Sequence, residues 1–330
     1  MMDIEGFRSF LTARGLPEEK VDAFGSVAGR YEAFLKDVLG GASPTAETVT
    51  RFVRLLTRQG EDTHDNFRAL ALYGRFLKNN DVYVTILQFL DGAEALESLH
   101  EKVGRAFGEA RRDEVFRGLK LPRLGTPCTE RPAFAQAFIE RLESRVGAAR
   151  VRRLLSGGLR RIPDDVYFSA RLRYLECKSI EEYLDRKGAE FVAELERIRD
   201  AGDLYFNQPM TDDVIDFVRA NPETRQGVVK DGVLYETKIP YMAKEYLAEK
   251  DPRMKRYYYC HCPWVRESIR TGEAQVPPVF CHCSLGFTKQ PWQVIFGREL
   301  EGEVLETVLS GGLVCRFAVK LPQAVASQGA

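Results

Sequence analysis

The sequence lacks a net charge and any long hydrophobic run. It has 48 Lys and Arg against 48 Asp and Glu, so no bulk attraction to nucleic acid or anionic lipid is expected. It contains no stretch of about 18 apolar residues, the length that a membrane-spanning helix needs. Its beginning, MMDIEGFRSFLTARG, lacks the apolar segment of a signal peptide. We therefore expect a cytoplasmic protein without a membrane partner.

Histidine is also scarce, and cysteine is unevenly distributed. The chain has four histidines and seven cysteines, and five of the cysteines lie between residues 260 and 315. In a reducing compartment, clustered cysteines hold a metal ion more often than they form disulfides. The chemistry of this chain is therefore expected in its C-terminal third.

Charge is balanced overall but uneven along the chain. Residues 1–110 carry 13 basic against 17 acidic side chains, whereas residues 111–200 carry 20 against 15. The basic excess lies in RLESRVGAARVRRLLSGGLRRIP, residues 141–163. This stretch is either a solvated helix face with a loop or an anion-binding patch.

Residues 1–110 have the pattern of an α-helical bundle. Apolar residues recur three and four apart in GLPEEKVDAFGSVAGRYEAFLKDVLGG, residues 15–41. The pattern repeats in SPTAETVTRFVRLLTRQG, where Ser43 is the expected N-cap and Gly60 the expected end. A further helix is expected to begin after Thr63.

Residues 5–90 resemble the SAM-like core-binding domain of phage-type tyrosine recombinases. The resemblance lies in the helical periodicity of FRSFLTARGLPEEKVDAFGSVAGRYEAFL, SPTAETVTRFVRLL and DTHDNFRALALYGRFL. In that family the bundle clamps DNA beside a catalytic domain with a His-x-x-Arg pair and a tyrosine nucleophile. No histidine here is followed three residues later by Arg, so recombinase activity is not expected. The acidic charge of the bundle argues against DNA and favours a protein partner.

The rest of the chain predicts a second domain of mixed structure. Pro, Gly and charged residues fill EARRDEVFRGLKLPRLGTPCTERPAF, so we expect a helical domain at 1–110, a linker at 111–133 and an α+β domain at 134–325. Asp231-Gly232 lies between two β-rich runs and predicts a hairpin. The predicted fold class is α+β: an N-terminal α-helical bundle followed by a Cys-rich, small-molecule-binding α+β domain.

The tripeptide Cys-His-Cys occurs twice in this second domain, in YYYCHCPWV and in PVFCHCSLG. In an extended segment Cys260 and Cys262 share one side, as do Cys281 and Cys283, while the histidines point away. Four thiolates from two segments can surround one tetrahedral zinc ion. Both pairs must bend to do so, because alternate side chains on a straight strand stand about 6–7 Å apart.

Cys315 is a fifth candidate ligand. The segment EGEVLETVLSGGLVCRFAVKLP predicts a hairpin that turns at Gly311-Gly312, with Cys315 on the apolar face of its second strand, beside Leu313, Phe317, Val319 and Leu321. Zinc is the favoured explanation for the five cysteines. Unligated buried thiols, a redox pair and an iron–sulfur site remain alternatives.

Three aromatic residues near the cysteines are candidate ligand-binding residues: Trp264, Phe287 and Trp292. Trp292 is expected on a short helix that starts at Pro291 and ends at Gly297. Their crowding beside a metal site predicts an aromatic-lined pocket, and ordinary core packing is the alternative.

The segment CHCSLGFTKQPWQVIFGRELEGEVLETVLSGGLVCRF is similar to the end of four-vinyl-reductase domains and of related sensor domains from aromatic-responsive regulators. It resembles still more the aminothiazoline-carboxylate hydrolase-like proteins. The shared positions are Cys281, Cys283, Gly286, Phe287, Trp292, Gly297, Glu306, Gly311 and Cys315. The resemblance implies, for residues 225–322, a small-molecule-binding fold with zinc beside the ligand cavity. The sensor domains have a cysteine where this chain has Leu309, so its ligand set would draw on Cys260 and Cys262.

These patterns predict a zinc-binding protein whose C-terminal domain binds a small molecule, as a sensor does. The alternative is a hydrolase acting on a small substrate with a C–N or C–S bond, through an open zinc position or a nucleophilic thiolate. The resemblance would then make Glu306 the candidate base. Binding is favoured over catalysis because an all-thiolate zinc site is usually closed and structural.

Overall fold

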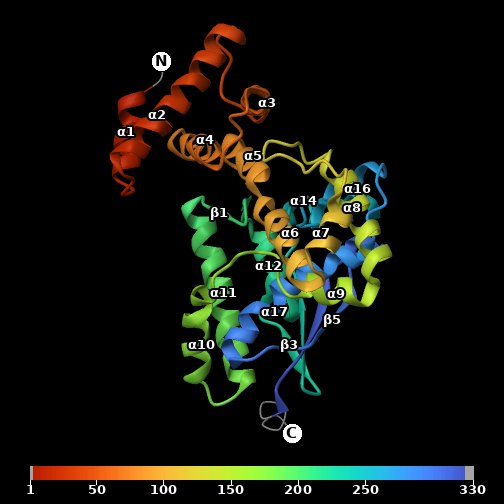
Figure 1. Ribbon diagram of the computed structural model, residues 1–330. Coiled ribbons are helices and arrows are strands. Elements are labelled where there is room, and N and C mark those ends of the chain that lie inside the picture. Colours follow the sequence, from red (N-terminus) through yellow and green to blue (C-terminus); the bar gives the residue numbers. More distant parts are fainter. Residues whose placement is uncertain (1–2, 324–330) are drawn as a thin grey trace. The chain divides into compact units, whose positions relative to one another are not determined.

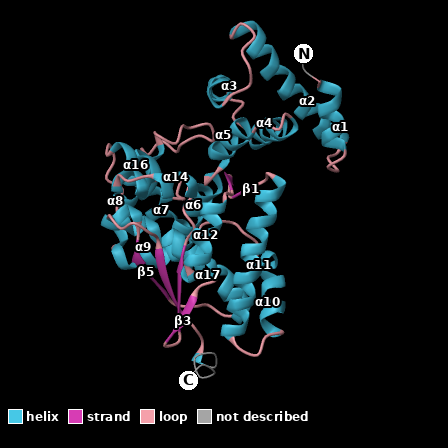
Figure 2. Ribbon diagram, turned by 180° about the vertical axis from the view of Figure 1, so that it is seen from behind, coloured by secondary structure: helices cyan, strands magenta, loops and turns pink. Residues whose placement is uncertain are grey.

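The computed structural model describes residues 3–323, and the chain has mixed α+β structure with mainly helical content (Figures 1 and 2). It divides into two compact units, here called unit 1 (residues 3–93 and 120–130) and unit 2 (residues 94–119 and 131–323). The division falls at residue 93 instead of 110, and the segment expected as a linker is shared between the units. No helix among the described residues is long and apolar enough to cross a membrane.

Unit 1 is the predicted bundle of helices. Its core contains the fully buried rings of Phe7, Tyr31, Phe52, Phe67 and Tyr73. The helices are α1 (Ile4–Thr12), α2 (Glu18–Ala33), the π-helical turn η1 (Phe34–Val38), α3 (Ala46–Gln59), α4 (His64–Phe76) and α5 (Asn80–Leu90). Gly60 ends α3 in the left-handed conformation and Thr63 caps α4, as the sequence predicts.

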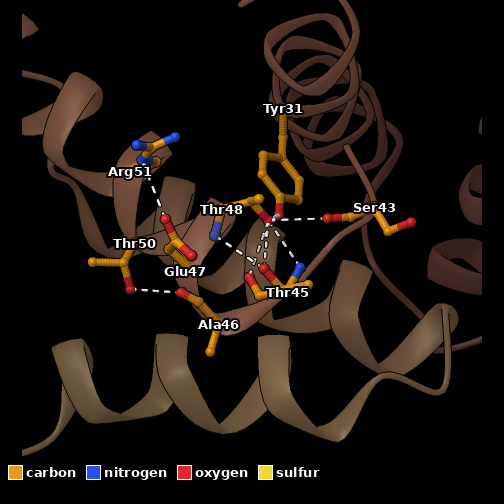
Figure 3. A network of polar contacts seen from close by, with 8 residues as sticks. All are labelled: Tyr31, Ser43, Thr45, Ala46, Glu47, Thr48, Thr50 and Arg51. Carbon is orange, nitrogen blue, oxygen red and sulfur yellow. Dashed lines mark hydrogen bonds and ion pairs between the residues drawn. The ribbon is translucent and has the colours of Figure 1, made fainter. Parts of the chain in front are cut away.

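The N-cap of α3 is Thr45 and not Ser43, and it belongs to a network of hydroxyl groups (Figure 3). Thr48 Oγ1 lies 2.8 Å from the Tyr31 hydroxyl and accepts from the Thr45 amide at 2.8 Å. The Thr48 amide in turn donates to Thr45 Oγ1 at 3.2 Å, which completes a capping box. Ser43 contributes only its carbonyl oxygen to the network. Thr45 is the cap, and Ser43 is not, because Thr45 lies three residues before Thr48 and the two residues can bond to each other.

Replacing Thr48 by Val is expected to destabilise the protein by about 2 kcal/mol. The substitution keeps the shape but leaves the hydroxyl of Tyr31, which is 0% exposed, without this partner. The matched control is Thr50→Val, because the Thr50 hydroxyl is at the surface and bonds only to the Ala46 carbonyl. Urea unfolding of the two variants measures the difference. If both variants lose the same free energy of unfolding, the hydroxyl network contributes no more stability than the hydroxyl of an ordinary helical threonine.

Unit 2 contains most of the helices and all of the strands. Its long helix α17 runs through the middle of the unit in both views (Figures 1 and 2). The helices are α6 (Ala93–Phe107), α7 (Glu109–Phe116), α8 (Arg131–Val146), α9 (Ala148–Ser156), α10 (Phe168–Leu175), α11 (Ile180–Ala201), α12 (Asp212–Ala220), α13 (Pro222–Arg225), α14 (Ala243–Ala248), α15 (Pro252–Tyr259), α16 (Arg266–Thr271) and α17 (His282–Phe296), with 3-10 turns η2 (Asp164–Tyr167), η3 (Pro278–Cys281) and η4 (Val308–Ser310).

The strands form a hairpin and one antiparallel sheet. The hairpin pairs β1 (Leu204–Tyr205) with β2 (Gln208–Pro209), and the sheet has the order β3 (Val228–Lys230), β4 (Val233–Thr237), β6 (Arg316–Lys320), β5 (Gly302–Glu306). The predicted turn at Asp231-Gly232 is confirmed: both residues have positive φ, and Lys230 pairs with Val233 across it.

The second predicted hairpin is confirmed only in part. β5 and β6 do pair, and Phe317, Val319 and Leu321 are buried. The second strand begins at Arg316, however, so Leu313 and Cys315 lie in the connection, and Leu313 is exposed. The carboxylate of Glu306 explains the shortening, because it accepts the backbone N–H groups of Leu313 and Val314 that a ladder would need.

Helix α17 packs on the sheet and fixes the centre of unit 2. Trp292 and Ile295 are buried against Leu234 of β4 and Val319 of β6. The indole N–H of Trp292 donates to Glu236 at 3.0 Å, and Lys187 of α11 pairs with the other oxygen of this carboxylate at 2.9 Å. The sheet therefore carries α17 on one side and is tied to α11 through one satisfied carboxylate.

Candidate functional site

The five C-terminal cysteines come together from separate elements of unit 2. Cys260 ends α15 and Cys262 follows it, while Cys281 ends η3 and Cys283 lies in the first turn of α17. Cys315 immediately precedes β6. The expectation that Cys281 and Cys283 lie in an extended segment is wrong, because Pro278 starts a helical turn that continues into α17. We call these five residues the thiol cluster.

The thiols lie near enough to act on one another's ionisation. Burial raises the pKa of Cys281 well above its usual value, and Cys315, Cys260 and Cys262 raise it further. Burial also raises the pKa of Cys260, with added effects from Cys262 and Cys315. Four thiols from three chain segments therefore share one electrostatic environment, and the raised pKa values of Cys260, Cys281 and Cys315 keep these three thiols protonated at neutral pH.

Two cations act on Cys283, whereas one acts on Cys315 and one on Cys260. Burial raises its pKa, but Arg160, Lys238 and the backbone N–H of Leu159 act in the opposite direction. Cys283 is half-buried, as are Cys262, Cys281 and Cys315. Cys281, Cys283 and Cys315 therefore lie just below the surface, where water still reaches them but burial is the largest effect on their pKa.

Lys238 is the residue of this site that the sequence did not single out. It follows β4, and its amide donates to the Cys315 carbonyl at 3.3 Å, so the two residues lie side by side at the end of the sheet. Its ammonium donates to the Ser284 hydroxyl at 3.0 Å and lies 5.0 Å from the centre of the Phe287 ring. Within residues 3–323, no carboxylate forms an ion pair with it.

Burial lowers the pKa of Lys238. The thiols of Cys315, Cys283 and Cys262 oppose this effect, while Arg160 adds to it. The alternation of residues in the predicted strand could have indicated which face Lys238 occupies. Residues two apart in a strand share a face, and Lys238 continues the alternation of Leu234 and Glu236, which face α17.

The two histidines of the repeated tripeptide bond to backbone carbonyls. His261 Nε2 donates to the Ile239 carbonyl at 2.6 Å, and His282 Nδ1 lies 3.0 Å from the Val279 carbonyl. Burial lowers the pKa of His261 to about 3, and Lys238 and Arg266 contribute to this shift. His261 is therefore neutral at physiological pH and lies in positive surroundings.

Tyr259 connects the cysteine segments to the sheet. Its ring is buried, and its hydroxyl donates to the Lys238 carbonyl and accepts the backbone N–H of Cys315. The backbone beside it is also fixed, since the Met242 amide donates to the Tyr258 carbonyl at 2.9 Å. The end of α15, which carries Cys260, is thus held against the residues that follow β4.

The position of Cys283 depends on a close approach between the backbone of α17 and the backbone of the segment after α9. A Cβ atom on Gly286 of α17 would lie 2.7 Å from the backbone nitrogen of Gly158 and 3.0 Å from the carbonyl of Ser156. The glycine lets the segment after α9 lie directly on the first turns of α17. This contact brings the Leu159 amide to the thiol of Cys283.

The three candidate aromatic residues do not form one pocket. Trp264 is buried in the core that includes the thiol cluster, with its ring 5.3 Å from the Arg131 guanidinium. Trp292 belongs to a different core, between α17 and the sheet. Phe287 lies beside Lys238, whose ammonium is 5.0 Å from the centre of its ring. The expected short helix at Pro291 is also wrong, because this proline lies inside α17 and only the end at Gly297 is confirmed.

Glu306, the candidate base, has a structural role. One of its oxygens accepts the Leu313 amide at 2.8 Å and the Val314 amide at 3.3 Å. A side chain at Gly312 would overlap this carboxylate. Glu306 still lies within electrostatic range of the cluster, because its charge raises the pKa of Cys315. A role as base stays a prediction.

The thiol cluster fits zinc in its chemistry but not in its arrangement. Soft thiol donors are the ligands that structural zinc prefers. Yet among the described residues no three Cys, His, Asp or Glu side chains are placed to hold a metal ion. Zinc at this cluster therefore stays a prediction, and its binding would require the thiols to turn toward one another.

No family model matches the chain, and comparison with curated proteins and with solved structures finds no match either. The resemblances to recombinase core-binding domains and to hydrolase-like or sensor domains accordingly stay predictions. The charges of unit 1 add no support for DNA, because basic side chains such as Lys20, Arg30 and Arg123 are paired with Asp65, Glu61 and Asp62.

Proposed function

We propose that unit 2 binds a small anionic molecule at Lys238 beside the thiol cluster. The observation that carries this proposal is the ammonium of Lys238, which has a hydroxyl and aromatic rings around it and no carboxylate partner among the described residues. A cation removed from water is costly unless an opposite charge compensates it. The thiols do not supply that charge while they are protonated. A bound anion would.

The surroundings favour a small ligand with an apolar part. Arg266 and Arg160, the latter paired with Glu94 at 2.7 Å, add positive charge near His261, although the chain as a whole is neutral. The rings of Phe287 and Phe317 lie 5.0 Å and 5.8 Å from the Lys238 ammonium. Such a mixture of a few polar groups with apolar walls is typical of small-molecule sites.

Melting temperatures measured with matched pairs of compounds test this proposal. The panel contains small organic acids and the neutral amide of each acid. We expect at least one acid to raise the melting temperature while its amide does not, because only the acid can pair with Lys238. If acid and amide act equally throughout, or if no compound acts, the proposed site is refuted.

Binding, as in a sensor, fits the thiols better than hydrolysis does. A thiolate is the nucleophile in cysteine chemistry, and burial raises the pKa of Cys260, Cys281, Cys283 and Cys315. Reduced, protonated thiols also agree with the reducing cytoplasm as the place of action.

The hydrolase alternative depends on Cys283, the thiol that faces Lys238 and Arg160. If this residue is a nucleophile, iodoacetamide should alkylate it first at neutral pH. Peptide mapping after partial alkylation identifies the modified cysteine. Preferential modification of the isolated Cys128 or Cys177 would count against a reactive thiol in the cluster.

We also propose that the thiol cluster binds a zinc ion. Burial disfavours the thiolate form of these cysteines, and the positive charge of zinc would stabilise that form. Protein purified under reducing conditions is expected to contain about one zinc ion per chain. The Cys260→Ser and Cys281→Ser variants should each be purified without zinc, whereas Cys128→Ser, in unit 1, should retain it. Elemental analysis of the four proteins decides it, and wild-type protein free of zinc and iron would refute the zinc proposal alone.

A further inference from the structure

One side of α17 is covered by a continuous segment that we call the surface strip: α9, the loop 157–163, η2 and α10. The strip follows α17 along its length. Gly158 touches Gly286 near the start, Gln290 donates to the Ile162 carbonyl at 2.7 Å, and Arg171 donates to the Val294 carbonyl at 2.7 Å.

The second half of the strip exposes large apolar side chains. Val166 is 60% exposed, and on α10 the exposed fractions are 53% for Phe168, 63% for Leu172 and 64% for Leu175. The three residues of α10 are spaced by four and three, so they share one helix face. A concentrated apolar face of this kind marks a contact surface.

The first half of the strip is basic. Residues 148–163 contain five arginines and no acidic residue, and two of the five, Arg160 and Arg161, pair with glutamates of α6. On α9, Val151 and Leu155 face the core, while Arg150, Arg152 and Arg153 are exposed. None of these three guanidinium groups forms an ion pair with another residue between 3 and 323.

We infer that the surface strip docks on an anionic membrane surface, with Phe168, Leu172 and Leu175 entering the lipid interface and the arginines of α9 facing the headgroups. Exposed apolar side chains and exposed cations, which this one segment carries, are the combination that peripheral membrane proteins use. Nucleic acid would engage the arginines but leave the apolar face uncovered. The attraction is local and short-ranged because the chain has no net charge.

Two acidic side chains of the strip, Asp164 and Asp165, are exposed on η2 and reduce its positive charge in part, while the three exposed arginines of α9 outnumber them. Asp164 accepts a hydrogen bond from Gln290, and Glu176 pairs with Arg186. The sequence predicts no membrane partner because bulk charge and spanning segments are both lacking, and neither property reports on a surface formed by folding.

Flotation with vesicles tests the inference. The full-length protein is mixed with vesicles of phosphatidylcholine alone, or of phosphatidylcholine and phosphatidylglycerol in equal parts. We expect binding to the anionic vesicles that weakens with salt. A Leu172→Asp, Leu175→Asp double variant should bind at least about tenfold more weakly. An Arg150→Gln, Arg152→Gln, Arg153→Gln triple variant should lose the preference for anionic vesicles. The control is Leu121→Asp, an exposed leucine of unit 1, which should bind like the wild type.

Circular dichroism is the control for folding, and each variant should give the spectrum of the wild type because the changes are at exposed positions. Absence of wild-type binding, or equal binding of all variants, would overturn the inference. A wild-type dimer that the double aspartate variant converts to a monomer, without vesicle binding, would overturn it in favour of self-association.

Discussion

The Lys238→Met variant is expected to be more stable than the wild-type protein at neutral pH and to lose its affinity for small anions. Methionine keeps the length and the apolar stem of lysine but removes a charge that has no carboxylate partner among residues 3–323. Lys238 is half-buried, and replacing its unpaired charge by an apolar residue of similar volume is expected to stabilise the protein by about 1 kcal/mol. A residue that weakens the fold but is needed for binding has the signature of a functional site.

The pH dependence gives this prediction a second readout. Burial lowers the pKa of Lys238 in the folded protein below the value of about 10.4 for an unfolded chain. Between the two values the unfolded chain binds more protons, so the free energy of unfolding rises with pH there. The wild type should therefore gain stability on the alkaline side through this window, and Lys238→Met should lack this contribution.

Urea unfolding at neutral and alkaline pH measures both effects. The matched control is Lys244→Met, at an exposed position of α14, which should change stability by less than about 0.5 kcal/mol. If Lys238→Met is clearly less stable than the wild type, the ammonium is well compensated within the protein, and the argument for a bound anion fails.

Gly286→Ala is expected to destabilise unit 2 by about 3 kcal/mol or more. The added methyl group would lie 2.7 Å from the nitrogen and 2.9 Å from the Cα atom of Gly158. These are backbone atoms, which cannot move aside as a flexible side chain does. The segment after α9 must then separate from α17, and the Leu159 amide leaves the thiol of Cys283.

Gly104→Ala is the control for this substitution. Gly104 also lies inside a helix of unit 2, but the nearest atom to its added methyl group is the flexible Arg112 Cδ at 3.4 Å. Alanine there is expected to be neutral or to stabilise by up to about 1 kcal/mol. Thermal unfolding compares the two, and similar curves would show that the contact of α9 with α17 can relax.

The sequence predicted the elements whose signals are local. The bundle of unit 1 follows from periodicity and caps, and the Asp231-Gly232 turn follows from residues that tolerate positive φ. The cap of α3 was misplaced by two residues, because Ser43 and Thr45 are both good caps and only the hydroxyl network with Tyr31 selects between them.

The errors at the site have one cause, which is that packing outweighs local preference. Pro291 should begin a helix, yet it lies within α17, where the burial of Trp292 and Ile295 offsets the cost of about 3 kcal/mol for an interior proline. Cys281 and Cys283 consequently lie on helical turns. The expected strand at Cys315 is lost because Glu306 binds the amides that precede it.

The content of the site was predicted better than its geometry. The five cysteines do gather in unit 2, but from four elements whose meeting depends on long-range contacts such as that of Gly286 with Gly158. Trp264 and Trp292 are separated in space although they lie in the same cysteine-rich region of the sequence. Lys238 was missed because a lysine at the end of a strand is ordinarily solvated, and only the sheet register places it beside Cys315.

The most direct test is the mass of the intact reduced protein, measured by native and by denaturing mass spectrometry after purification from its own cells. If Lys238 and the thiol cluster form a ligand site, the native mass exceeds the denatured mass by a small organic molecule that Lys238→Met no longer retains, and by one zinc ion that Cys281→Ser no longer retains. A native mass equal to that of the bare chain, in the wild type and in both variants, would contradict the account.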